Sequence, residues 1–202
     1  MGMKKLFIIG GMGSGKSTAR KVLAEQGVPF IDLDKVGHDV LEWDTVKDDL
    51  VEAFGADILG PDGRVVRSKV AAKAFTTPAE TRKLNRISMP RIEESFTDQL
   101  DELEREGNKA VVVEYSVFKN RQTSMANGAD VVIAVLAPLD ARIERAVKSG
   151  WDETDVRNRI ARQISDAERI EQADVVFNND GTPEQLREKV IAWWTEYAKT
   201  LD

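Results

Sequence analysis

Short apolar runs alternate along this chain with longer stretches in which apolar residues recur at helical spacing. Near-continuous apolar runs are typical of strands that are covered on both faces of a sheet. The helical stretches between them favour parallel strands. The pattern therefore predicts an α/β fold with a doubly wound, parallel sheet. The predicted strands are Leu6–Ile9, Pro29–Asp32, Ala110–Val113, Val131–Leu136 and Asp174–Phe177.

Several helix boundaries are marked in the sequence. Thr77 and Thr182 each precede a Pro and stand three residues before a Glu or a Gln, which is a capping-box pattern. Asp152 is also predicted to cap a helix. Pro90 lies inside a helical pattern, where we expect it to break or kink the helix. Trp193-Trp194 fall in the last predicted helix and are expected to be packing residues.

The composition limits the available chemistry. The 202 residues include 29 Lys and Arg, 35 Asp and Glu, one His and no Cys, with a net charge of −6. A classical zinc site, a thiol nucleophile and a disulfide are therefore not expected. The acidic balance argues against nucleic acid or an anionic membrane as a partner. The run Leu6–Ile9 is too short for a signal peptide, so we expect a cytoplasmic protein.

The strongest motif lies between the first predicted strand and the helix that follows it. It matches the Gly-x4-Gly-Lys-Ser/Thr pattern of a phosphate-binding loop. Its glycines let backbone amides face phosphate oxygens, and the helix N-terminus attracts the same anion. We expect Lys16 to bridge the β- and γ-phosphates and the Ser17 hydroxyl to bind Mg²⁺. The predicted nucleotide-binding residues of the loop are Gly11, Gly13, Ser14, Gly15, Lys16, Ser17 and Thr18.

This loop predicts a nucleoside triphosphate but not a reaction. Guanine recognition in G proteins uses an Asn-Lys-x-Asp segment, and Asn108–Val111 lacks the final Asp. A large AAA or helicase motor needs a longer chain, whereas a small phosphotransferase fits this length. A phosphate site without catalysis is an alternative at this point.

Two carboxylates, Asp32 and Asp34, lie where the second strand should end. In a parallel sheet that end faces the phosphate loop. A carboxylate there can orient and deprotonate an acceptor hydroxyl. Equally, Asp34 could cap a helix that starts near Lys35, and Asp32 could hold water around Mg²⁺ or close a turn. The sole His, His38, is expected on the surface of that helix.

Two connections are longer than a simple crossover needs. Residues 43–107 form a candidate acceptor-binding insertion with a turn signal at Asp62-Gly63, and residues 139–172 form the second long connection. Six of the 15 arginines fall between residues 142 and 169. As a group they suggest a lid that closes over the triphosphate and excludes water, the alternative being an ordinary charged helical hairpin. The core then comprises residues 1–42, 108–138 and 173–202.

Further segments carry a family resemblance when their order and spacing are taken together with the phosphate loop. They are Gly27–Asp34, Phe54–Ala56, Asp62–Arg67, Phe75, Arg159–Gln163 and Ala173–Gly181. Over nearly its whole length the chain resembles the dephospho-CoA kinase family. The resemblance implies a P-loop NTPase-type, three-layer αβα fold with a parallel five-stranded sheet, a helical acceptor-binding insertion and a helical lid.

The resemblance also implies a reaction and the residues that carry it. The family transfers the γ-phosphate of ATP, with Mg²⁺, to the ribose 3′-hydroxyl of dephospho-CoA. Asp34 matches the catalytic carboxylate, and Arg145 matches the arginine that stabilises the transferring phosphoryl group; Lys16 is the third expected catalytic residue. The region of Asn179 would border the adenine. Arg67 would help to hold the acceptor, or it is an ordinary surface arginine.

This sequence departs from the family pattern in four places. Met89 stands before Pro90 where the family usually has His, and Ser116–Phe118 stands where it usually has Pro-Leu-Leu. Glu114 replaces the common Asp, and Ser149 occupies a basic position of the lid. The first two changes lie on the acceptor side. They leave open a kinase for a nucleoside, nucleotide or other small acceptor. A second alternative is a non-catalytic ATP-binding regulator that keeps the loop but has lost the chemistry, although Asp34 and Arg145 argue against it.

Overall fold

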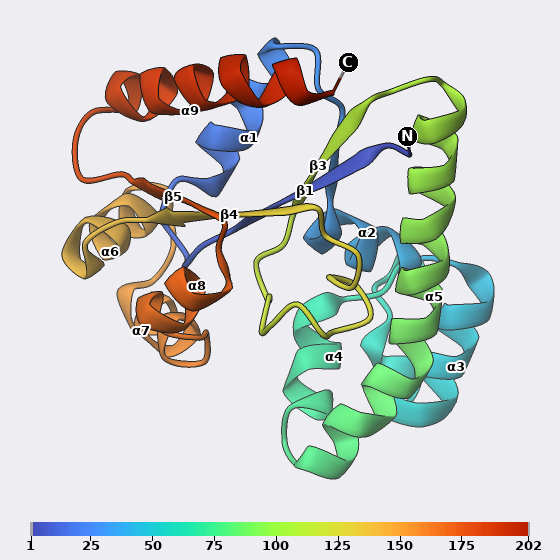
Figure 1. Cartoon of the computed structure of the whole chain (residues 1–202). Helices are drawn as coiled ribbons and strands as arrows, with labels where there is room; N and C mark the ends of the chain where they lie inside the picture. Colours follow the sequence, from blue (N-terminus) through green and yellow to red (C-terminus); the bar gives the residue numbers. More distant parts are fainter. Residues whose placement is uncertain (1, 202) are drawn as a thin grey trace. The chain divides into compact units, whose positions relative to one another are not determined.

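The computed structural model describes residues 2–201, in which five strands form one parallel sheet (Figure 1). Every neighbouring pair of strands is parallel, and the order is β2-β3-β1-β4-β5. The predicted α/β fold with a parallel, five-stranded sheet is confirmed, and each predicted run supplies one strand. The strands are β1 (Lys4–Ile9), β2 (Phe30–Asp32), β3 (Ala110–Glu114), β4 (Val131–Leu136) and β5 (Val175–Asn178).

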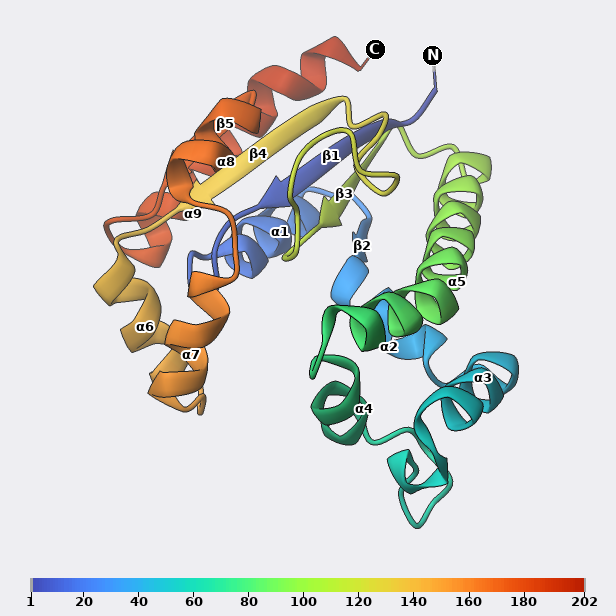
Figure 2. The ribbon, with the colours of Figure 1, turned by 90° about the horizontal axis from the view of Figure 1, so that it is seen from below.

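The chain divides into two compact units: one comprises the chain up to residue 33 together with residues from 100 onward, and the other comprises residues 34–99. The first unit contains the sheet, and its helices lie on both faces, so it is a three-layer αβα unit (Figures 1 and 2). Helices α1 and α9 pack together on one face, and α8 packs against β4 on the other. Its helices are α1 (Lys16–Glu25), α6 (Leu139–Lys148), α7 (Glu153–Ala161), α8 (Asp166–Gln172) and α9 (Pro183–Tyr197), followed by the short η2 (Ala198–Thr200).

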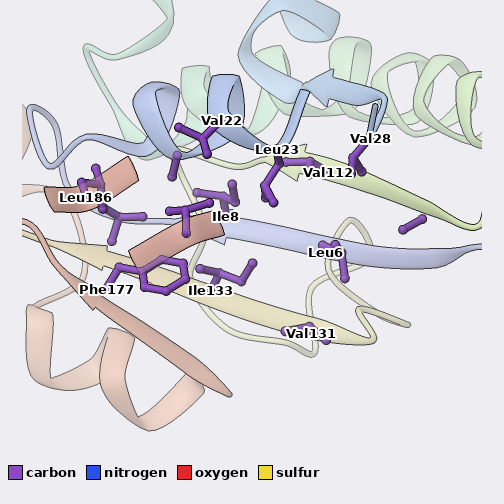
Figure 3. Packing of buried hydrophobic residues seen from close by; sticks show 14 residues of the cluster. Leu6, Ile8, Val22, Leu23, Val28, Val112, Val131, Ile133, Phe177 and Leu186 are labelled. Atoms are coloured by element: carbon purple, nitrogen blue, oxygen red, sulfur yellow. The ribbon is translucent and has the colours of Figure 1, made fainter. Parts of the chain in front are cut away.

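The main hydrophobic core lies between the sheet and the layer formed by α1 and α9 (Figure 3). Leu6 and Ile8 of β1 meet Ile133 of β4 there, together with Leu23 of α1 and Leu186 of α9. Each of these side chains is fully or almost fully buried, and burying one such side chain stabilises the fold by about 1.5–3 kcal/mol. The core therefore fixes the strand and helix that flank the phosphate-binding loop.

The last helix confirms the packing role expected for its tryptophans. Trp193 and Trp194 pack against the main core cluster. Trp193 also stacks on Tyr197, with the ring centroids 5.0 Å apart, and meets the edge of Phe177. These contacts attach α9 to β5 through aromatic surface.

The two edge strands are less buried than the sequence pattern predicts. Phe30 of β2 is 46% exposed and Val176 of β5 is 38% exposed. The strand order gives the reason, because β2 and β5 each have only one neighbouring strand. The central strands β3, β1 and β4 do follow the prediction of burial on both faces.

The predicted helix caps are present. The side chains of Thr182 and Asp152 accept hydrogen bonds from backbone amides at the starts of α9 and α7, and α9 has a complete capping box. The Thr77 hydroxyl accepts from the amide of Glu80 at the start of α5. Ser165 forms a further capping box, not predicted from the sequence, at the start of α8. In the described part of the chain, no helix combines the length and the apolar character needed to cross a bilayer.

The unit of residues 34–99 is helical. The turn predicted at Asp62-Gly63 is present: the Asp62 carboxylate accepts from the amide of Arg64, and Leu59 pairs with Val65 across the turn. Buried apolar side chains of α3, η1 and α4 provide its core. Its helices are α2 (Leu33–Val40), α3 (Asp44–Phe54), η1 (Ala56–Ile58), α4 (Arg67–Ala74) and α5 (Pro78–Arg105), of which α2 and α5 continue across the unit boundary.

The helix break expected at Pro90 does not form, because α5 continues through this residue as one helix. The other expected outcome is a kink, and α5 is bent in both views (Figures 1 and 2). A proline removes one backbone hydrogen bond and crowds the preceding turn, at a cost of about 3 kcal/mol. The many remaining backbone hydrogen bonds of this 28-residue helix outweigh that local loss. Ser88, two residues earlier, is buried and donates its hydroxyl to the carbonyl of Leu84 within the same helix.

Candidate active site

The phosphate-binding loop occupies the turn between β1 and α1, as predicted. Gly13 has a φ of 74°, a left-handed conformation that residues with a Cβ rarely adopt. A Cβ at Gly13 would also collide with the main chain of Arg142, and one at Gly11 would collide with the Arg142 guanidinium. These two glycines are therefore needed for the loop to fold against α6.

Two polar side chains of the loop are buried. Lys16 is 7% exposed, and its ammonium donates to the carbonyls of Gly10 and Gly11 at 3.1 and 3.3 Å. Ser14 is 1% exposed, and its hydroxyl oxygen has no hydrogen-bond partner within residues 2–201. A buried hydroxyl without a partner is costly, and a phosphate oxygen would satisfy it.

The start of α1 also suits an anion. Its N-cap is Gly15, which has no side chain to cap the helix, and its first turn contains no acidic residue. The amide groups at a helix N-terminus carry a partial positive charge and need acceptors. A bound phosphate can supply those acceptors, and Lys16 and Ser17 stand at the same helix start.

A cavity of about 320 Å³ opens above the loop. Six of the predicted loop residues line it, and Arg145 of α6 lines it as well. Gly11 and Asn179 are not among its lining residues. The complete lining is Met12, Gly13, Ser14, Gly15, Lys16, Ser17, Thr18, Glu114, Arg145, Ala146, Ser149 and Trp151.

The structure brings Arg145 and Asn179 together at this loop. The Arg145 guanidinium donates to the carbonyls of Gly13 at 3.5 Å and Asn179 at 3.3 Å. Both hydrogen bonds are long and weak, so a phosphoryl oxygen can replace them. The Asn179 amide is buried and donates to the carbonyl of Ser14 at 2.8 Å. Asn179 therefore braces the loop, and its predicted place beside the adenine stays a prediction.

Glu114, which the sequence marks only as a departure from the family pattern, is a residue of the candidate site. It ends β3, lies in register with Asp32 of β2, and lines the cavity. Its carboxylate forms an ion pair with Arg20 of α1 at 2.8 Å, and Arg20 in turn lies over the ring of Phe30. The Glu114 carboxylate and the Ser17 hydroxyl, whose oxygen atoms can bind a metal ion, thus line the same cavity.

This donor set fits a hard cation such as Mg²⁺, which prefers oxygen ligands and keeps several waters. In residues 2–201 there is no cluster of three or more His, Asp or Glu side chains that could hold a metal ion by itself.

Asp34 belongs to the other compact unit. Helix α2 begins at Leu33, so Asp34 lies in the first helical turn, and the alternative that it caps a helix starting near Lys35 is wrong. Its side chain is exposed. An acidic residue in the first turn is stabilised by the helix dipole, but that position leaves the carboxylate accessible to a substrate.

The unit of residues 34–99 has a cavity of its own, of about 360 Å³. Arg67 lines it, with its guanidinium 3.1 Å from the ring nitrogen Nδ1 of His38. Arg64 lies 3.7 Å from Glu42 in the same wall. The cavity thus has both positive and negative side chains around it, which suits a polar ligand. The complete lining is His38, Asp39, Glu42, Asp62, Arg64, Val65, Val66 and Arg67.

Sequence comparison decides the family. The model of the dephospho-CoA kinase family matches residues 6–185. The chain belongs to the dephospho-CoA kinase family. A dephospho-CoA kinase of Corynebacterium efficiens is 40% identical over 187 residues, which cover 92% of each chain.

Solved structures share the fold of this chain. TT1252 from Thermus thermophilus superposes with a TM-score of 0.82 at 26% identity, covering 97% of this chain and 98% of that one. A dephospho-CoA kinase from Campylobacter jejuni has a TM-score of 0.66 at 19% identity over 96% of this chain and 97% of its own, and shows the common fold. A shikimate kinase from Acinetobacter baumannii shares the fold at lower similarity, with a TM-score of 0.53 at 16% identity over 96% of this chain and 94% of its own.

Besides Glu114, two departures from the family pattern lie in the first unit, at Ser149 and at Ser116–Phe118. Ser149 lines the cavity, but its hydroxyl donates to the carbonyl of Arg145 and brings no charge. Trp151 lines the cavity two residues later, and the guanidinium of Arg159 lies 4.5 Å from the centre of its ring. The carbonyl of Ser116 accepts a long, 3.4 Å hydrogen bond from Gln163.

Proposed function

We propose that this chain phosphorylates the ribose 3′-hydroxyl of dephospho-CoA with ATP, giving CoA and ADP. The observation that carries the proposal is the cavity at the phosphate-binding loop, where Lys16, Ser17 and Arg145 converge in a member of the dephospho-CoA kinase family. Both substrates are small, charged and water-soluble, and we propose that the reaction takes place in the cytoplasm.

In the proposed reaction the acceptor oxygen attacks the γ-phosphorus of ATP. A new oxygen–phosphorus bond forms, and the bond from the γ-phosphorus to the β–γ bridging oxygen breaks. Asp34 takes the proton of the 3′-hydroxyl, and ADP leaves with the electron pair of the broken bond. This general-base role is worth about 10²–10⁴-fold in rate.

Positioning and charge neutralisation supply the remainder of the proposed rate acceleration. Lys16 would leave the loop carbonyls for the β- and γ-phosphates, and Arg145 would exchange its long hydrogen bonds for the transferring phosphoryl group. The loop amides and the Ser14 hydroxyl would bind phosphate oxygens. Bound Mg²⁺, held by Ser17 and with Glu114 nearby, would neutralise phosphate charge. No phospho-enzyme is expected.

The test is ADP release by the purified chain across a panel of acceptors. We expect turnover with dephospho-CoA and only background ATP hydrolysis with nucleosides, nucleotides and shikimate. Turnover on another acceptor, with none on dephospho-CoA, would show that Met89 and Ser116 belong to a different acceptor site. ATP binding without transfer to any acceptor would instead indicate a regulator.

Calorimetric titration with dephospho-CoA separates binding from rate. A chain that binds dephospho-CoA and releases no ADP has the acceptor site but lacks the chemistry. A chain that does not bind dephospho-CoA, yet binds ATP, refutes the acceptor assignment and leaves the nucleotide site standing.

A further inference from the structure

One residue of the phosphate-binding loop, Met12, is bound through its backbone amide and its carbonyl by the segment of residues 139–172. The amide of Met12 donates to the side-chain oxygen of Gln163 at 3.0 Å. The carbonyl of Met12 accepts from Nε of Arg142, also at 3.0 Å. The Met12 side chain packs against the small apolar cluster of α6 and α7 that includes Ile143 and Val156. Met12 is therefore attached to this segment through its amide, its carbonyl and its side chain.

Arg142 occupies an unusual place for an arginine. It is only 4% exposed, and burial lowers the pKa of its guanidinium, although Asp166 opposes that shift. The nearest carboxylate contact is long, with Nη1 3.6 Å from Asp166. Its buried Nη2 has no hydrogen-bond partner in the part of the chain that the structure describes. Such incomplete pairing of a buried charge costs free energy.

The loop is shaped around this arginine. The guanidinium of Arg142 lies where a Cβ of residue 11 would be, and its main chain lies where a Cβ of residue 13 would be. Both positions are glycines of the phosphate-binding motif. The conformation of the loop and the position of Arg142 therefore depend on each other.

Arg169 provides a comparison within the same cluster. It is as buried as Arg142, at 3% exposed, and binds the same carboxylate, with Nη1 2.6 Å from Asp166. Among the described residues, Arg169 forms an ion pair with Asp166, whereas Arg142 also donates a hydrogen bond to the carbonyl of Met12. The two arginines share burial and partner, and differ in their contact with the loop.

From these contacts we propose that Arg142 and Gln163 are positioning residues for ATP binding. Neither lines the cavity above the loop, so both act through the backbone of Met12, Gln163 at its amide and Arg142 at its carbonyl. They hold the loop in the shape that presents its amides to phosphate, and they make residues 139–172 and the loop move together. The inference rests on the proposed use of this loop for ATP.

The test compares Arg142→Met with Arg169→Met, because each change removes one buried guanidinium beside Asp166. Calorimetry gives the dissociation constant for ATP, and steady-state assays with dephospho-CoA give KM and kcat. We expect Arg142→Met to raise the dissociation constant and the KM for ATP about tenfold, in line with the loss of a charge-assisted hydrogen bond. Arg169→Met should leave both within about twofold and lower the melting temperature. Arg142→Lys should recover part of the affinity.

The rate of amide hydrogen exchange in residues 10–16 separates a local change in the loop from a loss of overall stability. We expect faster exchange there in Arg142→Met and in Gln163→Leu, and no change in Arg169→Met. Equal effects of Arg142→Met and Arg169→Met on ATP affinity would overturn the proposal, and so would unchanged affinity in Arg142→Met. If Arg142→Met does not fold, the ATP affinity and the hydrogen exchange of Gln163→Leu test the proposal instead. If the wild-type chain binds ATP but does not phosphorylate dephospho-CoA, the proposed function fails, while the affinity comparison still decides the positioning role.

Discussion

The two cavities of this protein have similar volumes, about 320 Å³ at the phosphate-binding loop and about 360 Å³ in the unit of residues 34–99, but they are built differently. The first is formed largely by a glycine-rich backbone and a helix N-terminus, with its cations buried or half-buried. The second is formed by side chains of both charges, most of them exposed. A site built from backbone groups suits a chemical group that many enzymes bind, such as a triphosphate. A site built from side chains can be altered by substitution to fit a different acceptor.

The largest effect expected in the unit of residues 34–99 comes from Asp34. Asp34→Asn should reduce turnover by about 10²–10⁴-fold, because the amide cannot take the proton of the acceptor hydroxyl. The dissociation constant for ATP should not change. The control is Asp48→Asn, which alters an exposed carboxylate of α3 in the same unit. Near-normal turnover of Asp34→Asn would reduce this residue to a stabiliser of the first turn of α2.

At the phosphate-binding loop, Lys16→Met should reduce turnover by about 10²–10³-fold, since it removes one preorganised cation from the transferring phosphoryl group. Unlike Asp34→Asn, it should also weaken ATP binding. Lys21→Met, on the exposed side of α1, is the matched control. If both lysine variants kept full activity, the cavity above the loop would not be the nucleotide site.

Arg67 tests whether the second cavity binds the acceptor. Arg67→Gln should raise the KM for dephospho-CoA about tenfold and leave the KM for ATP unchanged, because a guanidinium that binds phosphate oxygens is lost. Arg82→Gln removes another exposed arginine of this unit and should change neither constant. Equal changes in both KM values for Arg67→Gln would contradict an acceptor-specific role.

The smallest expected effect is a change in tryptophan fluorescence when ATP binds. Trp151 lines the cavity above the loop, so ATP binding should change its fluorescence. Trp151→Phe should abolish the signal, and Trp43→Phe, in the other unit, should retain it. A signal that persists in Trp151→Phe would mean that one of the remaining tryptophans reports the nucleotide.

The strands, the main caps and the phosphate-binding loop could be predicted from the sequence because local patterns determine them. The run Leu6–Ile9 followed by the glycine-rich loop allows few other structures, and Thr182 sets the start of α9 through its own side chain. The uninterrupted α5 could not be predicted, because Pro90 is a local signal that the rest of the helix outweighs.

Some residues of the candidate site could not be predicted from the sequence because their roles depend on long-range contacts. By sequence Arg142 is one of several arginines in residues 139–172, but in the structure it is buried against the loop at Gly11 and Gly13. Gln163 reaches Met12 across 151 positions of sequence, and no local pattern marks that pair. The ion pair between Arg20 and Glu114 likewise joins a helix to a strand far along the chain.

The most direct measurement is to identify the product. The purified chain is incubated with ATP, Mg²⁺ and dephospho-CoA, and the product is analysed by mass spectrometry and phosphorus NMR. We predict one added phosphoryl group on the ribose 3′-oxygen, with one ADP formed per product, and loss of both in Asp34→Asn. Unmodified dephospho-CoA after prolonged incubation with folded protein that binds ATP would contradict the assignment.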